Sequence, residues 1–164
     1  MSPADFQRRL LRLKQELPDF FNRYVPTIIG RTAVSFFKRT FQKEAWDRQH
    51  WPEVKRRTPG TPEFRQAARH HPARKRRKIL TGDTGDLARS IEVEHADPHQ
   101  VTIFTNPAAF KSRAPYGRVH NEGLRAGRGS GFIMPKRQFM GHSRQLDRLI
   151  SHAIETKLKK ILNK

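Results

Sequence analysis

Three residues that lie close together in the sequence, Tyr116, His120 and Glu122, are the first candidates for chemistry in this chain. On a β-strand, residues two apart project to the same face, so His120 and Glu122 could act as an acid–base pair. With nearby aspartates, they could instead hold the divalent metal ion of a nuclease. The alternative is that these polar residues fix a loop or a contact between subunits. We favour this alternative, because permissive spacing is the only support for catalysis.

The other acidic residues form no recognisable catalytic or metal-binding motif. Asp83, Asp86, Glu92, Glu94 and Asp97 are scattered along the chain, without a paired-carboxylate pattern beside a histidine. The sequence also lacks a Ser/His/Asp signature, a phosphate-binding loop with its lysine, and the usual nucleic-acid-binding motifs. Cysteine is absent, which excludes disulfides and cysteine-ligated metals. We therefore expect no enzymatic activity, no catalytic residue, no cofactor and no metal.

The strongest chemical feature of the sequence is its positive charge. Lys and Arg number 34 against 15 Asp and Glu, which gives a net charge of +19. Such a chain attracts polyanions, so nucleic acid is the simplest partner, with an acidic protein face or a membrane surface as alternatives. The densest basic run follows the pair His70-His71, which is a poor metal site because neighbouring cations repel a metal ion. We expect this run to contact DNA or an acidic partner, although a mobile solvated loop would look the same; it comprises Arg74, Lys75, Arg76, Arg77 and Lys78.

Length and hydropathy indicate a protein that works in aqueous surroundings. No apolar run approaches the roughly 20 residues of a membrane-spanning helix, and the N-terminus lacks the apolar region of a signal peptide. The 164 residues predict a single domain over 1–164, but only 35% of them are hydrophobic. We therefore expect a modest core and a stability that depends on neighbouring subunits.

Periodicity divides the chain into helical ends and a mixed centre. Residues 1–43 should form N-terminal helices: Ser2 and Pro3 start the first, and an apolar stripe runs along it to Pro18, where the chain should kink and resume at Asp19. A second helix should run from Pro26 and form the main wall of the core. Residues 44–78 show no period and predict an extended basic arm, with one short helix near residues 63–70. Residues 142–164 predict a C-terminal helix capped by Ser143.

Residues 79–141 predict the sheet and its loops. Asp83 or Thr84 should cap a short helix. Apolar residues alternate over 91–95 and again over 101–105 around a turn at 97–100, which predicts a β-hairpin with one buried face. Residues 116–119 and 132–134 could pair with the same sheet. The fold class is therefore α+β, with N-terminal helices and a C-terminal helix packed on a small antiparallel sheet with long basic loops.

Four sequence motifs, in order, carry a resemblance to a known family. A Trp51 after an apolar helix is followed by Leu80-Thr81-Gly82, which leads to Gly85-Asp86-Leu87-Ala88-Arg89-Ser90-Ile91. Tyr116 then precedes His120-Asn121-Glu122-Gly123, and Met134-Pro135-Lys136-Arg137-Gln138-Phe139-Met140-Gly141 comes shortly before the last helix. This order resembles the phage virion morphogenesis family, which includes tail-completion and head–tail joining proteins. The resemblance covers roughly residues 36 to 160.

The resemblance implies a structural protein of the phage neck or tail without enzymatic activity. Copies would form a ring, for which we expect a hexamer, that completes the tail or joins it to the head, with genomic DNA passing through the lumen. Its partners would be neighbouring neck or tail proteins, with no membrane and no small-molecule substrate. Its location would be the head–tail junction of the virion, after assembly in the host cytoplasm. The subunit interface would involve Tyr116, His120, Arg125, Arg128, Pro135, Arg137 and Phe139.

Two other functions remain open from the sequence alone. A sequence-independent nucleic-acid-binding protein unrelated to virions would carry the same charge, and it would bind duplex DNA with a steep dependence on salt. A metal-dependent nuclease that uses His120, Glu122 and a nearby aspartate would lose cleavage, but not folding, when His120 is replaced.

Overall fold

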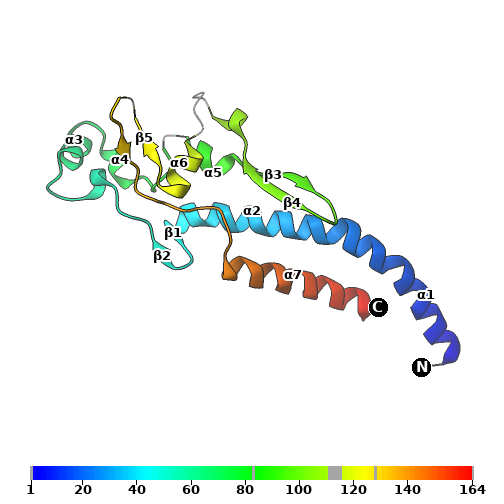
Figure 1. The fold of residues 1–164 in the computed structure, drawn as a ribbon. Coiled ribbons are helices and arrows are strands. Elements are labelled where there is room, and N and C mark those ends of the chain that lie inside the picture. The colour runs from blue at the N-terminus through cyan, green and yellow to red at the C-terminus, as the bar shows by residue number, and fades with distance from the viewer. Residues whose placement is uncertain (1, 83, 111–115, 128, 164) are drawn as a thin grey trace. The chain divides into compact units, whose positions relative to one another are not determined.

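The computed structural model describes residues 2–82, 84–110, 116–127 and 129–163, and two compact units share the chain (Figure 1). The first unit combines Met1–Ser35, Val93–Phe104 and Ser143–Lys164. The second combines Phe36–Glu92 and Thr105–His142. Both units therefore bring together segments that are far apart in the sequence. That residues 1–164 act as one domain stays a prediction.

The first unit begins with a long helical run that the sequence predicts only in part. Helix α1 (Pro3–Asp19) starts as expected, because the Ser2 hydroxyl accepts a hydrogen bond from the Asp5 backbone N–H and the Asp5 carboxylate bonds back to Ser2. The chain resumes as a helix after Pro18, as expected, but Pro18 itself lies inside α1 and the irregular turn comes only after Asp19. The chain continues through a π-helical turn, η1 (Phe20–Tyr24), directly into α2 (Val25–Lys43). This wider turn shifts the hydrogen-bond register just after the proline, so the missing N–H does not end the helix.

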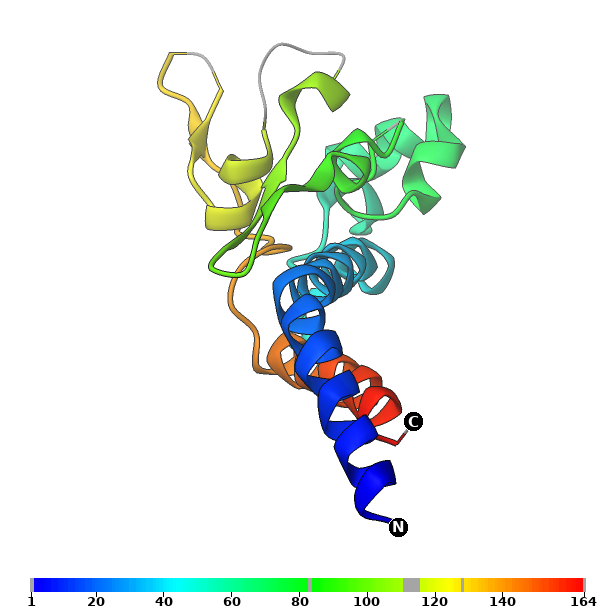
Figure 2. The same cartoon turned by 90° about the vertical axis from the view of Figure 1, so that its right-hand side faces the viewer.

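The C-terminal helix packs against the first helix within this unit. Helix α7 (Arg144–Leu162) is capped as expected by Ser143, whose hydroxyl accepts hydrogen bonds from the N–H groups of Gln145 and Leu146. Figures 1 and 2 both show α7 alongside α1, and the Arg9 guanidinium donates a hydrogen bond to the Leu162 carbonyl. The small core of this unit includes Phe20 and three further buried residues: Ala33, Leu146 and Ile161.

The predicted hairpin is confirmed, but its buried face is not. Strands β3 (Ile91–Ala96) and β4 (Val101–Thr105) pair with each other. The Asp97 carboxylate closes the turn by accepting hydrogen bonds from the backbone N–H groups of His99 and Gln100, both at 2.7 Å. Along β3 only Ile91 is buried. The residues of β4 are all half-buried. The alternation therefore identifies the strands correctly, but the expected face is only partly buried.

The second unit folds where an extended arm is expected. Its segment 44–78 contains a short hairpin of β1 (Ala45–Trp46) and β2 (Gln49–His50), a 3-10 turn η2 (Lys55–Arg57), and helices α3 (Pro62–His70) and α4 (Pro72–Arg76). The short helix near residues 63–70 is confirmed as α3. Because α3, α4 and η2 contact one another, this segment is a small helical cluster and not an arm.

Aromatic rings form the core of the second unit. The Phe41 ring lies 5.6 Å from that of Trp51 and 5.1 Å from that of Phe139, between ring centroids. Phe36 and Phe37, earlier on α2, both pack against Trp46. Helix α2 therefore supplies the main aromatic wall of this core, as its wide apolar face predicts.

The remaining elements of the second unit surround this core. Helix α5 (Asp86–Arg89) follows Gly85 without a side-chain cap, so the cap expected at Thr84 is wrong, and Asp83 lies outside the described residues. After η3 (Pro107–Ala109) comes helix α6 (Gly117–Glu122), so the strand expected at residues 116–119 is also wrong. Strands β5 (Arg125–Ala126) and β6 (Phe132–Ile133) pair with each other. Among the described residues, the strands form separate pairs and not one sheet, within a fold of the expected α+β class.

Candidate functional site

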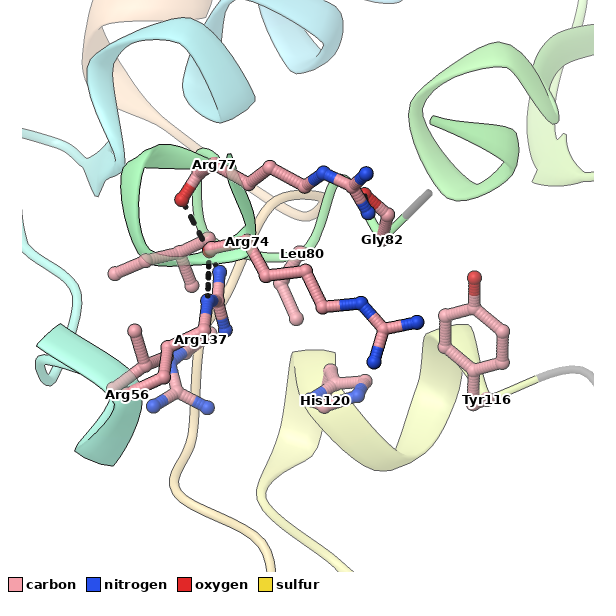
Figure 3. Close-up of a pocket in the computed structure, with 10 residues that line it drawn as sticks. Arg56, Arg74, Arg77, Leu80, Gly82, Tyr116, His120 and Arg137 are labelled. Carbon is pink, nitrogen blue, oxygen red and sulfur yellow. Dashed lines mark hydrogen bonds between the residues drawn. The ribbon is translucent and has the colours of Figure 1, made fainter. Parts of the chain in front are cut away.

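The second unit contains a pocket of about 450 Å³ that is lined by basic side chains (Figure 3). Residues from η2, α4, α6 and the segment after β6 meet there, although they are far apart in the sequence. No acidic residue is among the described residues that line the pocket. They are Val54, Arg56, Arg74, Arg77, Ile79, Leu80, Gly82, Tyr116, His120 and Arg137.

An ion pair beside the pocket holds the helical cluster in place. Both guanidinium NH₂ groups of Arg57 donate to the Glu44 carboxylate, at 2.9 and 2.6 Å, and both side chains are largely buried. The same carboxylate accepts a hydrogen bond from the Ile79 backbone N–H at 2.5 Å. The hydrogen bonds from Arg57 are the main reason that the pKa of Glu44 is lowered. Glu44 therefore connects the end of α2 to Arg57 and to Ile79, which lie before and after the helices α3 and α4.

Arg56 and Arg137 bring two further cationic groups to the pocket wall. Arg56 donates to the backbone carbonyls of Arg74 and Arg77, drawn as dashed lines in Figure 3. Arg137 is only 5% exposed and donates to the carbonyls of Pro52 and Glu53, at 3.0 and 3.3 Å. Burial, followed by the charge of a neighbouring arginine, lowers the pKa of both groups. Neutral carbonyls accept their hydrogen bonds, and the nearby carboxylates act in the opposite direction: Glu44 and Glu53 raise the pKa of Arg56, and Glu53 raises that of Arg137.

Hydrogen bonds join residues 116–123 to residues 134–141, the two segments that supply Tyr116, His120 and Arg137 to the pocket. The Arg137 N–H donates to the His120 carbonyl at 2.7 Å. The Asn121 side-chain carbonyl accepts from the N–H groups of Phe139 and Met140, at 2.9 and 3.0 Å. Gly123 ends α6 with a φ of 73°, and a Cβ at this position would lie 2.9 Å from the Cβ of Lys136. The close approach of the two segments therefore requires glycine at position 123.

His120 lies between these segments as a neutral side chain. Burial, followed by the charge of Arg137, lowers the pKa of His120 from 6.5 to about 4. Its Nδ1 atom is buried and has no hydrogen-bond partner among the described residues, and its ring contacts that of Tyr116 at 5.8 Å.

We expect this histidine to make the protein less stable as the pH is lowered from about 6.5 to about 4. In this pH window the His120 imidazole is protonated in the unfolded chain but stays neutral in the folded chain. The loss should be about 1–2 kcal/mol, allowing for the partial exposure of the ring. Urea unfolding across this window should show it, and His120→Gln should flatten the slope. An equal slope in the variant would contradict the assignment.

Helical geometry separates the proposed acid–base pair. His120 and Glu122 lie on α6, where residues two apart face different directions. The Glu122 carboxylate instead accepts hydrogen bonds from Arg118 Nε, at 3.1 and 3.2 Å. Within the described ranges, no group of three or more His, Asp or Glu side chains comes together in a way that could hold a metal ion. The prediction that His120 and Glu122 project to the same face is therefore wrong.

The predicted contact residues fall into three groups. Five of them line the pocket: Arg74, Arg77, Tyr116, His120 and Arg137. Arg76 and Lys78 do not line it and are exposed. The Lys75 ammonium group lies 3.8 Å from the centroid of the Phe64 ring. Arg125 and Pro135 are exposed, and Arg128 lies outside the described residues.

Phe139 and Arg137 are buried, at 1% and 5% exposure, so in this chain they serve the core and the pocket wall. Their predicted role at a subunit interface stays a prediction.

Sequence reasoning missed four residues that build the site. Glu44, Arg56 and Arg57 lie in a segment without periodicity, and the hydrogen bonds that build the site join them to residues 13 to 35 positions away. The role of Asn121 depends on a contact 18 residues along the chain. The only signals in the sequence were the adjacent arginines Arg56 and Arg57, and the position of Asn121 between His120 and Glu122.

Comparison with known proteins agrees with the order of the motifs. No helix in the described part of the chain is both long and apolar enough to cross a membrane. No curated protein and no solved structure matches the chain. The model of the phage virion morphogenesis family matches residues 6–159, which is nearly the whole chain and includes every residue of the pocket. The chain therefore belongs to the phage virion morphogenesis family, and its role lies in the assembly of the phage virion.

Proposed function

We propose that this protein is a non-enzymatic component of the phage neck or tail, located at the head–tail junction. Copies of it form a ring that completes the tail or joins it to the head, around the path of the genomic DNA. Membership of the virion morphogenesis family supports the assembly role. The ring, a hexamer by our expectation, and its contacts with neighbouring virion proteins are part of the proposal.

The observation that carries the proposal is the group of apolar side chains on α1 that remain exposed although the helix packs against α7. The helix has the amphipathic stripe that the sequence predicts, yet none of its residues is buried. Leu10 and Leu11 are 50% and 63% exposed, and Phe6 is 48% exposed. Isolated proteins rarely leave several large apolar side chains together in water. A second copy of the chain, or an adjoining virion protein, would bury them and supply the stability that the small core lacks.

A second exposed apolar pair supports the same conclusion. Phe132 and Ile133 form strand β6 and are 56% and 70% exposed. They pair with Arg125 and Ala126 of β5. Arg125 was predicted to contact a neighbour, and the adjacent apolar side chains give such a contact something to bury.

We expect the double change Leu10→Glu/Leu11→Glu to weaken self-association roughly a hundredfold or more. Burial of one leucine side chain stabilises an interface by about 1.5–3 kcal/mol, and about 1.4 kcal/mol corresponds to a tenfold change in affinity. Light scattering with size-exclusion chromatography would measure the assembled mass over a range of protein concentrations. Circular dichroism should show unchanged helix content.

A matched control places the same two carboxylates on exposed polar positions of α1, as Gln7→Glu/Gln15→Glu. This control should assemble like the wild type, because it removes no apolar surface. Equal loss of assembly in both variants would show that charge, and not burial of Leu10 and Leu11, controls association. A wild-type chain that stays monomeric even with its head or tail partners would contradict the ring.

The net charge of +19 keeps one other function in consideration, sequence-independent binding of nucleic acid outside a virion. It requires tight binding of free duplex DNA by the monomer, with affinity that falls steeply as salt rises. A ring protein needs only to tolerate DNA in its lumen and should bind the free duplex weakly. Titration of the duplex at two salt concentrations separates the two functions.

A further inference from the structure

The first unit contains a pocket of its own, of about 300 Å³, between the N-terminal helical run and α7. Its apolar lining comes from Phe20 and Tyr24 on η1 and from Ile161 near the end of α7. Phe20 and Ile161 are buried, whereas Tyr24 is exposed. Two of these side chains therefore form the floor and the third stands at the edge of an apolar hollow that can receive a side chain from outside.

The side chain that fits this hollow lies near the other end of α1. Phe6 is 48% exposed, and Leu10, one turn later on the same side of the helix, is 50% exposed. Helix α7 ends beside α1 where the Arg9 guanidinium donates to the Leu162 carbonyl. Figures 1 and 2 both show the first turns of α1 extending beyond that end. Phe6 therefore belongs to a part of α1 that α7 does not cover.

A chain cannot place its own Phe6 in its own pocket. Phe6 and Phe20 lie in one continuous helical run, and at about 1.5 Å per residue the helix holds them about 20 Å apart. The occupant must come from another molecule, and a second copy of the chain always carries the required aromatic side chain. Because the donor and the pocket are different surfaces, a copy that gives its Phe6 to one neighbour keeps its pocket open for the next. Such head-to-tail contacts generate rings when they close.

The charges around the pocket suit a second copy of this cationic chain. The charged lining residues are Glu16, Asp19, Lys157 and Lys160. Their charges sum to zero, although the whole chain carries +19. Glu16 and Asp19 also pair along the helix with Arg12 and Arg23, at 4.0 and 3.3 Å, in partly exposed contacts that contribute little and leave carboxylate oxygens available.

The donor segment has the matching pattern of charge. Asp5 and Arg8 flank Phe6 and form an ion pair with each other on the surface of α1. When Phe6 enters the pocket, the guanidinium of Arg8 can face the carboxylates of the rim and the carboxylate of Asp5 can face its lysines. Opposite charges on both sides of a central aromatic side chain would fix the direction in which the two copies meet.

We propose that Phe6 of one copy enters the pocket between the N-terminal helical run and α7 of the next copy, where it contacts Phe20, Tyr24 and Ile161. Subunits are thereby joined head to tail. This inference rests on the proposed ring, to which it adds the two surfaces that meet and the direction of the contact.

Disulfide cross-linking tests this contact directly, because the chain contains no cysteine of its own. Pro3→Cys places a thiol one turn before Phe6 on α1. Thr156→Cys places one a turn before Lys160, on the pocket side of α7. Both positions are exposed, and neither lines the pocket. The two single variants are mixed at a concentration at which the wild type associates, and are then oxidised.

The mixture should give a disulfide-linked dimer with one chain of each variant, because a disulfide needs Cβ atoms about 3.5–4.5 Å apart. Pro3→Cys alone should give little dimer, since the pocket of its neighbour then has no thiol. The matched control replaces Thr156→Cys by Ser151→Cys, at an exposed position on a different side of the same helix. Its mixture with Pro3→Cys should not cross-link.

Truncation of the two aromatic side chains gives a second measurement. Phe6→Ala and Tyr24→Ala should each weaken self-association about tenfold or more, as measured by light scattering. The double variant should lose little more than either single one, because both changes remove the same contact. Phe21→Ala is the matched control: this side chain is as exposed as Tyr24 and lies on the same turn η1, but it does not line the pocket. It should associate like the wild type, and melting curves identify any variant that unfolds.

The outcomes separate this inference from the proposed ring. Cross-linking of Pro3→Cys alone as readily as of the mixture would mean that the α1 helices of two copies pair with each other, which overturns the head-to-tail contact. A wild type that associates while the mixture does not cross-link, or equal weakening by Phe21→Ala and Tyr24→Ala, would leave the ring but exclude the pocket. A wild type that is monomeric alone and assembles only onto head or tail proteins would assign the exposed Phe6 to a different virion protein. One that stays monomeric even with those partners would overturn both proposals.

Discussion

Replacement of Phe139 by alanine is expected to lower the free energy of unfolding by about 3–5 kcal/mol. The side chain is 1% exposed, its ring lies 5.1 Å from that of Phe41, and it approaches Gly117 on α6. Truncation would leave a cavity at the point where α2, α6 and the segment after β6 meet, and the rigid surroundings could fill it only in part. Urea unfolding followed by near-ultraviolet circular dichroism would measure the loss.

Phe132→Ala is the matched control, because it makes the same chemical change at a side chain that is 56% exposed. It should change the stability of the isolated chain by less than about 0.5 kcal/mol. If the two variants were equally stable, Phe139 would not be a core residue, and its original assignment to the subunit interface would become the better one.

Glu44→Gln should cost about 2–4 kcal/mol, the second largest effect that we expect. The change leaves the largely buried Arg57 without its bidentate partner and weakens the bond to the Ile79 N–H. Because Arg57 holds the pKa of Glu44 below its usual 4.5, the wild type has this stabilisation above pH 4.5 and loses it as the pH falls below that value. The variant should lack this acid-dependent part. Urea unfolding at neutral and acidic pH would measure both.

Glu63→Gln controls for the loss of a carboxylate. Glu63 pairs with Lys55 at 3.6 Å on the surface of the same helical cluster, with both side chains well exposed. Its replacement should cost less than about 1 kcal/mol. A cost equal to that of Glu44→Gln would mean that Glu44 is an ordinary surface ion pair and does not hold the pocket segment together.

Local signals in the sequence predicted the elements that local chemistry controls. The caps at Ser2 and Ser143 and the Asp97 turn are each formed by residues within three positions of one another. The π-helical turn after Pro18 was missed because a proline predicts a kink at its own position, while a shift in hydrogen-bond register leaves no mark in the sequence. Helix α6 was missed because its six residues include one large apolar side chain, Val119, and no helical period.

The candidate site could be predicted only in outline. Charge density singled out the run that contains Arg74 and Arg77, and the motif order singled out His120 and Arg137. Their meeting in one pocket depends on long-range contacts such as those from Arg137 to Pro52 and from Arg57 to Glu44. No periodicity encodes such contacts. For the same reason, the burial of Phe139 was not visible in a segment that reads as an exposed corner.

The most direct test of the central claim is electron microscopy of lysates in which the phage is produced without this protein. The account predicts tailless heads beside free or incomplete tails, and normal particles when the wild-type chain is supplied in trans. The Leu10→Glu/Leu11→Glu variant should fail to restore them, whereas Gln7→Glu/Gln15→Glu should succeed. Complete, tailed particles in the absence of the protein would contradict a role in completing the tail or joining it to the head.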